Sequence, residues 1–593
     1  MADTDIGSPD PATTFAAEPG DAAAVPAAGR APGAEIRRRR GGWLVIAVPA
    51  AVSLVVGGYQ IGGPSLWRDE AYTKDAIARP FTQIFALLGH QDAVHGAYYL
   101  LMHVVAAVLG TSATALRFPS LCAMVIATGF VAATGRRAAT LARAPAPAAA
   151  DEAPAVADEG QDAGRADRGL NVPALTGLFA GLLFATAPYM TYYAQMARSY
   201  AIETMFAVVA SYLLLRAWPD GRWRWWLGYG AAVALTGLFN IFGLLILAAH
   251  GVTLLLTDAR GQAGAGRRIG RIPLRWLAVC SAVVIVLGPL LGLASRQQVQ
   301  IAWLSRPTFK AMERLATDLA GSRQLVLPFA LLALGGVFAA CLADDWRPLN
   351  PAAIALPWLV VPPFLLVAAS FVKPVYYVRY VEFCLPALAI LAGAGLTGLI
   401  RLAAATPLGR RRPGWRRLGP LRLGRLRLGP LRLAWLPAVL AGALPAALLA
   451  ALLAGPQHAI RQTAARPDNL RLASAIVAAH EQPGDVVFYL PATMHVLGTG
   501  YPAPFSRLRN IALNKSAIAS GTLTGTEITS PARLKSRFTD VRRVWVVTGA
   551  STYTFPTPST PMDKEKMALI NGAGLHILQR WRAGEVMLTL YGS

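Results

Sequence analysis

Two adjacent carboxylates, Asp69 and Glu70, are the residues whose types and spacing point most directly to chemistry. They stand in the run Trp-Arg-Asp-Glu-Ala at 67–71, directly after the first long apolar segment. A carboxylate can remove a proton from an attacking hydroxyl group, and a second one can assist it or bind a metal ion. The competing interpretation is that the two carboxylates only begin a solvated loop at the membrane surface and take no part in chemistry. The positions of the other polar groups decide between the two.

The composition indicates a membrane protein with many spans. The 593 residues are 54% hydrophobic and only 15% charged, whereas soluble domains carry about 25% charged residues. The formal net charge of +24 could suggest a nucleic-acid partner. However, the basic residues concentrate in a few loops between apolar segments, which is typical of membrane topology, so we expect no nucleic-acid partner. The four cysteines lie far apart and show no metal-ligand spacing.

Eleven apolar segments are predicted to cross the bilayer as helices. Four arginines at 37–40 should keep the start of the first span in the cytoplasm, and alternation then sets the side of every loop. A further apolar segment at 98–109 is short, and a crossing there would turn Arg136 and Arg137 outward, so we expect a surface or re-entrant helix. The predicted spans are 43–61, 116–135, 172–190, 201–215, 227–239, 241–256, 276–294, 325–342, 352–372, 380–400 and 436–453.

The chain divides into segments of different character. Residues 1–42 predict a disordered cytoplasmic tail, and 43–455 a transmembrane domain. Within that domain we expect a first outer loop at 62–115 with an amphipathic surface helix over 75–89, a disordered inner loop at 138–168 and a basic inner loop at 401–434. Residues 456–593 mix strand and helix patterns, which predicts a small extracytoplasmic α/β domain.

In this C-terminal domain, Asp468 is expected to cap a helix that ends at His480. A second helix is predicted at 563–570. The predicted strands are 485–490, 544–548, 575–579 and 586–591.

On this topology, polar side chains gather at the outer ends of the spans, and the middles of the spans are almost free of charge. A transporter would normally place ionisable groups near the midplane, between two similar halves. The pattern instead favours a reaction between a lipid-linked substrate and a partner in the outer aqueous space. Cations here could bind a phosphate, although arginines could also snorkel and tyrosines could form an aromatic belt. The residues are Asp69, Glu70, Asp92, His95, Arg117, Arg198, Tyr200, Glu203, Lys373, Arg379 and Tyr380.

Four motifs between residues 43 and 400 resemble those of the GT-C membrane glycosyltransferases, in particular the protein O-mannosyltransferase and aminoarabinose-transferase group. They are Trp-Arg-Asp-Glu-Ala at 67–71, His-Gly-Ala-Tyr-Tyr-Leu at 95–100 with Leu-Arg-Phe-Pro-Ser at 116–120, Tyr-Ala-Gln-Met-Ala-Arg-Ser-Tyr at 193–200, and Arg-Tyr at 379–380. The sequence departs from the family at 96–97, where two prolines are usual, and at 195–196, where an acidic residue is missing.

The resemblance implies a GT-C fold and transfer of a sugar from a polyprenyl-phosphate donor to a glycan, lipid or protein acceptor, with inversion at the anomeric carbon. It implies that Asp69 is the general base, with Glu70 as helper or metal partner. His95 aligns with a phosphate-binding lysine of the aminoarabinose-transferase branch, so it would bind the donor phosphate together with Arg198 and Arg379. The supporting residues would be Asp92, Tyr200, Glu203 and Tyr380.

Some alternatives stay open at this point. Glu70, Asp92 and His95 could hold a divalent ion, Mg²⁺ or Mn²⁺. A lipid or glycan flippase, or a non-catalytic factor in cell-envelope assembly, would also be compatible with the predicted topology. Bacterial members of the group act at the outer face of the cell membrane, which implies a cytoplasmic N-terminus and an external C-terminal domain. The sugar itself, mannose or arabinose by analogy, does not follow from the sequence.

Overall fold

The computed structural model describes residues 42–143, 170–261, 272–341, 349–405, 447–448, 451–549 and 560–593. Outside these residues lie all but the last residue of the predicted tail at 1–42, most of the predicted inner loops at 138–168 and 401–434, and most of the predicted eleventh span at 436–453. Where the first of these inner loops is described, it is helical, because the second span runs on to Leu141 before it ends.

A helix or a pair of helices occupies each of the first ten predicted spans. Six helices within the described residues are long and apolar enough to cross a membrane, and a seventh span results if the pair α8 and α9, bent by 61°, is counted as one. The helices are α2 (Leu44–Gly58), α6 (Ala113–Leu141), α8 (Val172–Thr186), α9 (Pro188–Ala194), α10 (Tyr200–Asp220), α11 (Trp223–Phe239), η3 (Ile241–Leu245), α12 (Ile246–Gly261), α13 (Ile272–Arg296), α15 (Arg323–Cys341), α16 (Pro351–Val372), η6 (Val378–Cys384) and α17 (Leu385–Ala405).

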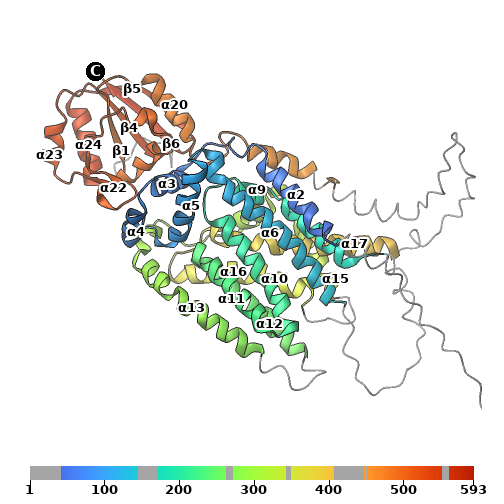
Figure 1. The fold of residues 1–593 in the computed structure, drawn as a ribbon. Coiled ribbons are helices and arrows are strands. Elements are labelled where there is room, and N and C mark those ends of the chain that lie inside the picture. The colour runs from blue at the N-terminus through green and yellow to red at the C-terminus, as the bar shows by residue number, and fades with distance from the viewer. Residues whose placement is uncertain are drawn as a thin grey trace, which may run out of the picture. The chain divides into compact units, whose positions relative to one another are not determined.

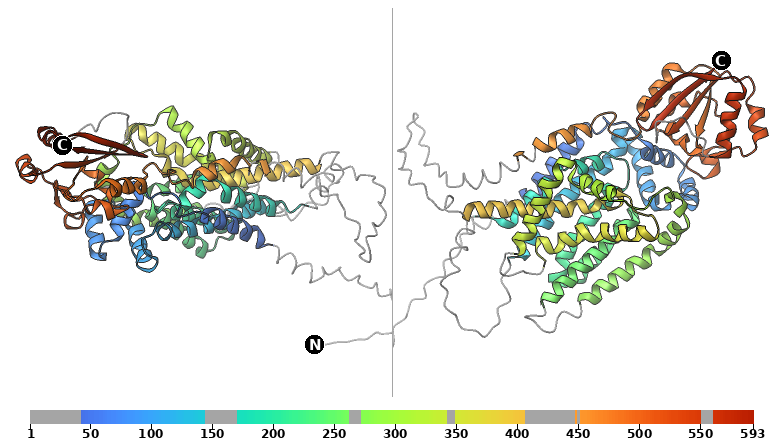
Figure 2. Two further views of the ribbon diagram at one scale, coloured as in Figure 1. Left: turned by 90° about the horizontal axis from the view of Figure 1, so that it is seen from above. Right: turned by 180° about the vertical axis from the view of Figure 1, so that it is seen from behind.

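Neighbouring helices of this region pack side by side, with α6 against α8 and α10, α10 against α11, and α15 against α17 (Figures 1 and 2). The contact between α15 and α17 depends on glycine. A Cβ atom at Gly395 would lie 1.9 Å from the Leu332 carbonyl oxygen, and one at Gly336 would lie 2.2 Å from the Leu391 carbonyl oxygen. Helices in lipid gain packing energy when small residues let their backbones approach. Any larger residue at these two positions would separate the helices.

The predicted first outer loop contains the helices α3 (Arg68–Ile77), α4 (Phe81–His90), η1 (Ala93–His95) and α5 (Gly96–Leu109). The prediction of one helix over 75–89 is wrong, because one helix ends at Ile77 and the next begins at Phe81. Pro80 causes the break: it has no N–H group for a continuing helix, and it disfavours helical geometry in the residue before it. The short apolar segment at 98–109 lies in α5, whose 14 residues are fewer than a span needs. Between α13 and α15 the chain forms the amphipathic helix α14 (Phe309–Ala320).

The C-terminal region forms a four-stranded sheet in the order β1-β4-β6-β5. Strands β1 (Val486–Leu490) and β4 (Arg543–Gly549) are parallel, and β6 (Val586–Gly592) pairs antiparallel with both β4 and β5 (His576–Ala583). One face of the sheet packs against α20 (Leu470–His480) and η8 (Ala492–Gly498), and the other packs against α23 (Pro531–Arg537) and α24 (Pro561–Gly572). Figure 2 shows the strands side by side among these helices. The sheet is therefore covered by helices on both faces.

The predicted strands and helices of this region are present, with ends that differ by a few residues. The predicted cap of α20 is wrong: Asn469, not Asp468, accepts the hydrogen bond from the Leu472 N–H group. The Asp468 side chain points instead toward α3. A two-stranded pair, β2 (Leu513–Lys515) with β3 (Thr526–Glu527), was not predicted, because strands of two or three residues are too short to show a pattern.

Candidate active site

The first turn of α3 carries both acidic residues of the opening motif. Consecutive residues of an α-helix point about 100° apart, because 3.6 residues make one turn. Asp69 and Glu70 therefore cannot face the same surroundings. The structure separates them: Glu70 is fully buried, whereas the Asp69 side chain is 23% exposed.

Glu70 is held in a saturated buried network. Its two carboxylate oxygens accept hydrogen bonds from Nε and Nη2 of Arg117 at 2.8 and 2.7 Å, and one of them also accepts from the Ala197 N–H group at 2.9 Å. The remaining Arg117 N–H groups donate to the carbonyl oxygens of Ile61, Pro64 and Ser65 at 2.9–3.0 Å. All five donors of the guanidinium are thus satisfied. This network joins α3, α6 and the segment before α10, so its geometry gives Glu70 a structural role and no free oxygen for a metal ion.

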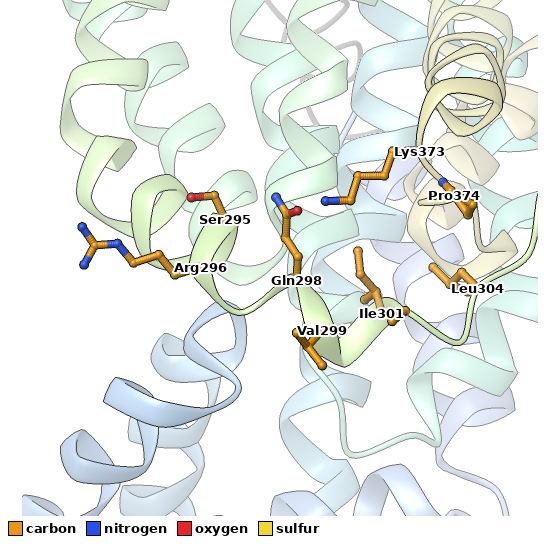
Figure 3. Close-up of a pocket in the computed structure, with 9 residues that line it drawn as sticks. Ser295, Arg296, Gln298, Val299, Ile301, Leu304, Lys373 and Pro374 are labelled. Atoms are coloured by element: carbon orange, nitrogen blue, oxygen red, sulfur yellow. The ribbon is translucent and has the colours of Figure 1, made fainter.

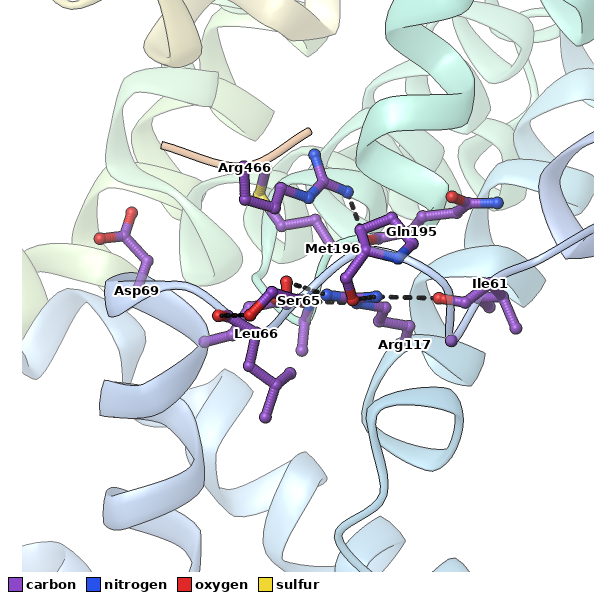
Figure 4. A network of polar contacts seen from close by, with 12 residues as sticks. Ile61, Ser65, Leu66, Asp69, Arg117, Gln195, Met196 and Arg466 are labelled. Atoms are coloured by element: carbon purple, nitrogen blue, oxygen red, sulfur yellow. Dashed lines mark hydrogen bonds and ion pairs between the residues drawn. The ribbon is translucent and has the colours of Figure 1, made fainter. Parts of the chain in front are cut away.

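Asp69 points away from this network, as Figure 4 shows. One of its carboxylate oxygens forms an ion pair with Nη1 of Arg379. The second oxygen has no hydrogen-bond partner among the described residues. Burial by itself would raise the pKa of Asp69, but the charges of Arg379 and Arg198 outweigh it and hold the pKa below its ordinary value. Asp69 is therefore ionised at neutral pH, with one oxygen available to accept a proton.

Arg379 is fixed between aromatic rings. Its guanidinium lies 4.7 Å from the ring centre of Trp67 and 4.7 Å from that of Tyr377, and Nη2 donates a 2.9 Å hydrogen bond to the Tyr377 hydroxyl. Cation–π contacts of this kind attract the cation while leaving its edge free to bind an anion. The sequence motif identified Arg379 as a candidate site residue, but it did not predict the two aromatic rings that contact its guanidinium. Trp67 stands beside Asp69 in the opening motif, which is the signal that could have identified it.

Arg198 lies on the other side of Asp69 and is 7% exposed. Its Nη1 is 3.5 Å from the Asp69 carbonyl oxygen, and its Nη2 is 2.6 Å from Nε2 of His95. A guanidinium can only donate, so Nε2 of His95 must accept and the imidazole proton must sit on Nδ1. Burial and the Arg198 charge lower the pKa of His95 well below its ordinary value. His95 is thus neutral rather than a cation, and its predicted part in phosphate binding stays a prediction.

The neutral His95 ring can still donate a hydrogen bond to a ligand. Its buried Nδ1 has no hydrogen-bond partner in the described part of the chain. Because this nitrogen carries the proton, it is an unused donor. A buried donor without a partner costs free energy, and an oxygen of an anionic ligand would satisfy it.

The predicted supporting residues have different surroundings. Tyr200 packs edge-on against the ring of Tyr193, and Tyr380 stacks on Phe242 with the ring centres 4.5 Å apart. Asp92 accepts a 2.6 Å hydrogen bond from the Tyr99 hydroxyl, and burial raises its pKa.

Glu203 is fully buried within α10 and accepts a 2.8 Å hydrogen bond from the Asn240 side chain. These contacts brace the helices behind the site.

The predicted metal set of Glu70, Asp92 and His95 does not form a site. Both oxygens of Glu70 accept from Arg117 and one also accepts from Ala197, and the ring nitrogen Nε2 of His95 accepts from Arg198. No group of three or more His, Cys, Asp or Glu residues within the described ranges is arranged to hold a metal ion. We therefore derive no chemical step through a metal.

A groove of about 430 Å³ lies between the end of α13 and the start of the segment after α16. It is lined by Ser295, Arg296, Gln298, Val299, Ile301, Ala302, Leu304, Lys373 and Pro374. Figure 3 shows the ammonium group of Lys373 beside the amide of Gln298, whereas Arg296 extends away from both. The neighbouring Trp303 ring contacts Tyr377, with the ring centres 5.3 Å apart. The groove is thus connected to the residues that hold Arg379.

Comparison with known proteins adds three findings. A family model described as dolichyl-phosphate-mannose-protein mannosyltransferase matches residues 171–291. This range includes Arg198 but neither Asp69 nor Arg379. Among curated sequences, no protein matches the chain. Among solved structures, ArnT from Cupriavidus metallidurans bound to undecaprenyl phosphate matches with a TM-score of 0.50 and 15% identity over 93% of this chain and 98% of that chain.

The chain has the GT-C fold. This confirms the predicted fold class, and it agrees with the helices that are long enough to span a membrane. A weaker similarity is to arabinofuranosyltransferase AftD from Mycobacteria (TM-score 0.43, 15% identity, 92% of this chain and 39% of that chain). The Archaeoglobus fulgidus oligosaccharyltransferase, solved with Zn and sulfate, follows with a TM-score of 0.37 and 12% identity over 85% of this chain and 68% of that chain.

Proposed function

We propose that this protein transfers a sugar from a polyprenyl-phosphate donor to an acceptor hydroxyl at the outer face of the cell membrane. One observation carries the proposal: an ionised carboxylate with one unpaired oxygen, Asp69, lies in direct contact with Arg379 and beside Arg198. A base next to two cations suits a reaction in which a hydroxyl loses a proton while a phosphate departs. The undecaprenyl phosphate in the ArnT structure supports a lipid phosphate as carrier.

The proposed step balances as follows. The unpaired oxygen of Asp69 takes the proton of the acceptor hydroxyl, and the acceptor oxygen forms a bond to the anomeric carbon. The bond between that carbon and the phosphate oxygen breaks, and its electron pair leaves with the polyprenyl phosphate. Because the acceptor attacks opposite the departing phosphate, the anomeric configuration inverts. Arg198 and Arg379 compensate the charge of the phosphate, and Nδ1 of His95 can donate to one of its oxygens.

The outer location of this site is part of the proposal. It rests on the basic residues near the opposite ends of the spans, such as Arg136 and Arg137 near the end of α6, which should face the cytoplasm. The acceptor is a glycan, a lipid or a protein, and the C-terminal domain lies on the same outer side. A flippase remains the rival of another class, because it too would bind a polyprenyl lipid.

A panel of radiolabelled polyprenyl-phosphate sugars tests the proposal directly. Purified protein in lipid vesicles should release label from one member of the panel to a hydroxyl acceptor, and NMR of the product should show the inverted anomer. A scramblase assay on the same vesicles, with a fluorescent polyprenyl phosphate, is the control. Lipid movement across the bilayer without release of sugar would favour the flippase.

The pH dependence of transfer offers a further prediction. Arg379 lowers the pKa of Asp69, and Asp69 must be ionised to act as a base, so the rate should fall only when the pH drops below the lowered value. In Arg379→Gln the pKa of Asp69 rises, so the acid limb of the kcat/KM profile should move up by about 1–3 pH units, the usual effect of one nearby charge. Arg379→Lys keeps the charge and should leave the limb near its original position. An unmoved limb in Arg379→Gln would show that another group titrates.

A further inference from the structure

A short segment before α20, Arg466–Asn469, is fastened to the C-terminal sheet by its backbone. The Asn469 N–H group donates to the Ala583 carbonyl oxygen at 3.2 Å, and the Glu585 N–H group donates to the Pro467 carbonyl oxygen at 2.7 Å. One contact is to the last residue of β5 and the other to the turn between β5 and β6. The segment is therefore a rigid edge of the C-terminal domain.

Asp468 reaches from this edge to the first turn of α3. One carboxylate oxygen accepts a 3.1 Å hydrogen bond from the Arg68 N–H group, and the other accepts from Nη2 of Arg68 at 3.2 Å. The residue that precedes α3, Trp67, provides no side-chain cap. The first N–H groups of a helix lack partners within the helix, and a carboxylate there also favours the helix dipole. The missing cap of α3 is thus supplied by a residue 400 positions away in the sequence.

Arg466 reaches from the same edge to a different part of the site. It is 2% exposed, and its Nη2 donates to the carbonyl oxygens of Gln195 at 2.6 Å and Tyr192 at 3.2 Å. Its guanidinium also lies 3.9 Å from the centre of the Tyr192 ring. Figure 4 shows Arg466 above the Gln195 backbone. This backbone leads directly to Arg198, so Arg466 fixes the segment that carries it.

Apolar packing adds to the same attachment. Ala71 of α3 is fully buried in one cluster with Leu470 and Ala473 of α20 and with Val547 of β4. Lys74 on α3 donates a 2.8 Å hydrogen bond to the Gly500 carbonyl oxygen. The helix that carries the proposed base is thus in contact with the C-terminal domain through its apolar surface as well as its first turn.

We infer that Arg466 and Asp468 are positioning residues: by holding α3 and the 195–198 segment to one edge of the C-terminal domain, they add to the direct contacts between these two segments in setting the distance between Asp69 and Arg198. The inference rests on the proposed function, because the distance matters only if the two groups act on the same substrate. It assigns the C-terminal domain a part in the reaction without a catalytic residue of its own. Small displacements of reacting groups are costly, because a misplacement of about 1 Å can lower the rate by about 100-fold.

The test replaces Asp468 and compares two readouts. Asp468→Ala should lower kcat by about 10- to 100-fold while the KM for the polyprenyl-phosphate sugar changes little, because donor contacts stay intact. Asp468→Asn keeps a side-chain oxygen that can accept from the Arg68 N–H group, so it should recover most of the rate. Hydrogen exchange measured by mass spectrometry should speed up by about tenfold in peptides covering 66–72 of the Ala variant.

The matched control is Asp485→Ala. Asp485 is a second buried carboxylate of the same domain; it accepts hydrogen bonds from Nε of Arg543 and from the indole Nε1–H of Trp545, and neither residue belongs to α3. This variant should destabilise the domain and leave exchange at 66–72 unchanged. Equal losses of kcat and equal exchange in the two Ala variants would overturn the inference, since the effect would then be general destabilisation. If wild-type protein transfers no sugar but exchange at 66–72 still depends on Asp468, the proposed function fails and the attachment of α3 stands.

Arg466→Met provides a second, independent test of the inference. It should speed exchange in peptides covering 190–200, the segment before α10, and lower kcat without a matching rise in the donor KM. The same substitution at Arg471 is its control, because Arg471 is exposed and donates only to the carbonyl oxygens of Gly62 and Gly63 through its side chain. Unchanged exchange at 190–200 in Arg466→Met would overturn the assignment of Arg466.

Discussion

Asp69→Asn is expected to lower sugar transfer by about 10²–10⁴-fold, the usual contribution of a general base. The asparagine amide has nearly the same size as the carboxylate but cannot accept a proton. Arg379 keeps its contacts with the rings of Trp67 and Tyr377, so the donor phosphate should still bind. The measurement is label transfer from the polyprenyl-phosphate sugar under single-turnover conditions, with donor affinity determined separately by competition with unlabelled polyprenyl phosphate.

The matched control for this variant lies on the same helix. Asp75 of α3 forms an ion pair with Arg79 at 2.7 Å, and within the described part of the chain its side chain forms no hydrogen bond or ion pair with Asp69 or Arg198. Asp75→Asn should therefore transfer sugar at close to the wild-type rate. Full activity in Asp69→Asn would exclude Asp69 as the base. If that variant were also fully functional in cells, a flippase or a non-catalytic assembly factor would become the better explanation.

Glu70→Gln is expected to destabilise the protein by about 3–5 kcal/mol, the typical effect of removing one partner of a buried ion pair. The substitution leaves the Arg117 guanidinium buried with only carbonyl oxygens around it. It also replaces one of the two carboxylate oxygens with an NH₂ group, which would face N–H groups that now donate to Glu70. Thermal unfolding of the protein in detergent, followed by tryptophan fluorescence, should show a lower midpoint, and the yield of folded protein should fall.

Arg117→Met should have a similar effect from the other side of the pair, because it leaves a buried carboxylate without a counter-charge. Arg471→Met again serves as the control and should change stability by less than about 1 kcal/mol, as expected for an exposed side chain. The prediction would be contradicted by a Glu70→Gln protein of normal stability that has lost its activity. That result would return Glu70 to the catalytic role that the sequence resemblance implied.

Much of the architecture followed from the sequence, for a simple physical reason. Long apolar segments must cross the membrane as helices, because lipid offers no hydrogen-bond partners to an unpaired backbone. Charged residues at the ends of these segments must then lie near the membrane surface. The sequence alone therefore predicts that Asp69, Arg198 and Arg379 lie on one side of the membrane. It also predicts the mixture of strands and helices in the C-terminal region. Short-range breaks such as the one at Pro80 were less clear, since the apolar pattern continues across it.

The roles within the site were decided by the tertiary structure. Sequence spacing shows that Asp69 and Glu70 are adjacent, but only the position of Arg117 on α6 decides which of them is neutralised. His95 could be a cation or a neutral donor, and the contact with Arg198 decides for the neutral form. The sequence predicts that Asp468 caps the helix that follows it, α20, yet its carboxylate caps α3, which lies 400 residues earlier in the chain. Each of these roles depends on the side chain packed opposite the residue, and contacts between distant segments leave no periodic pattern in the sequence.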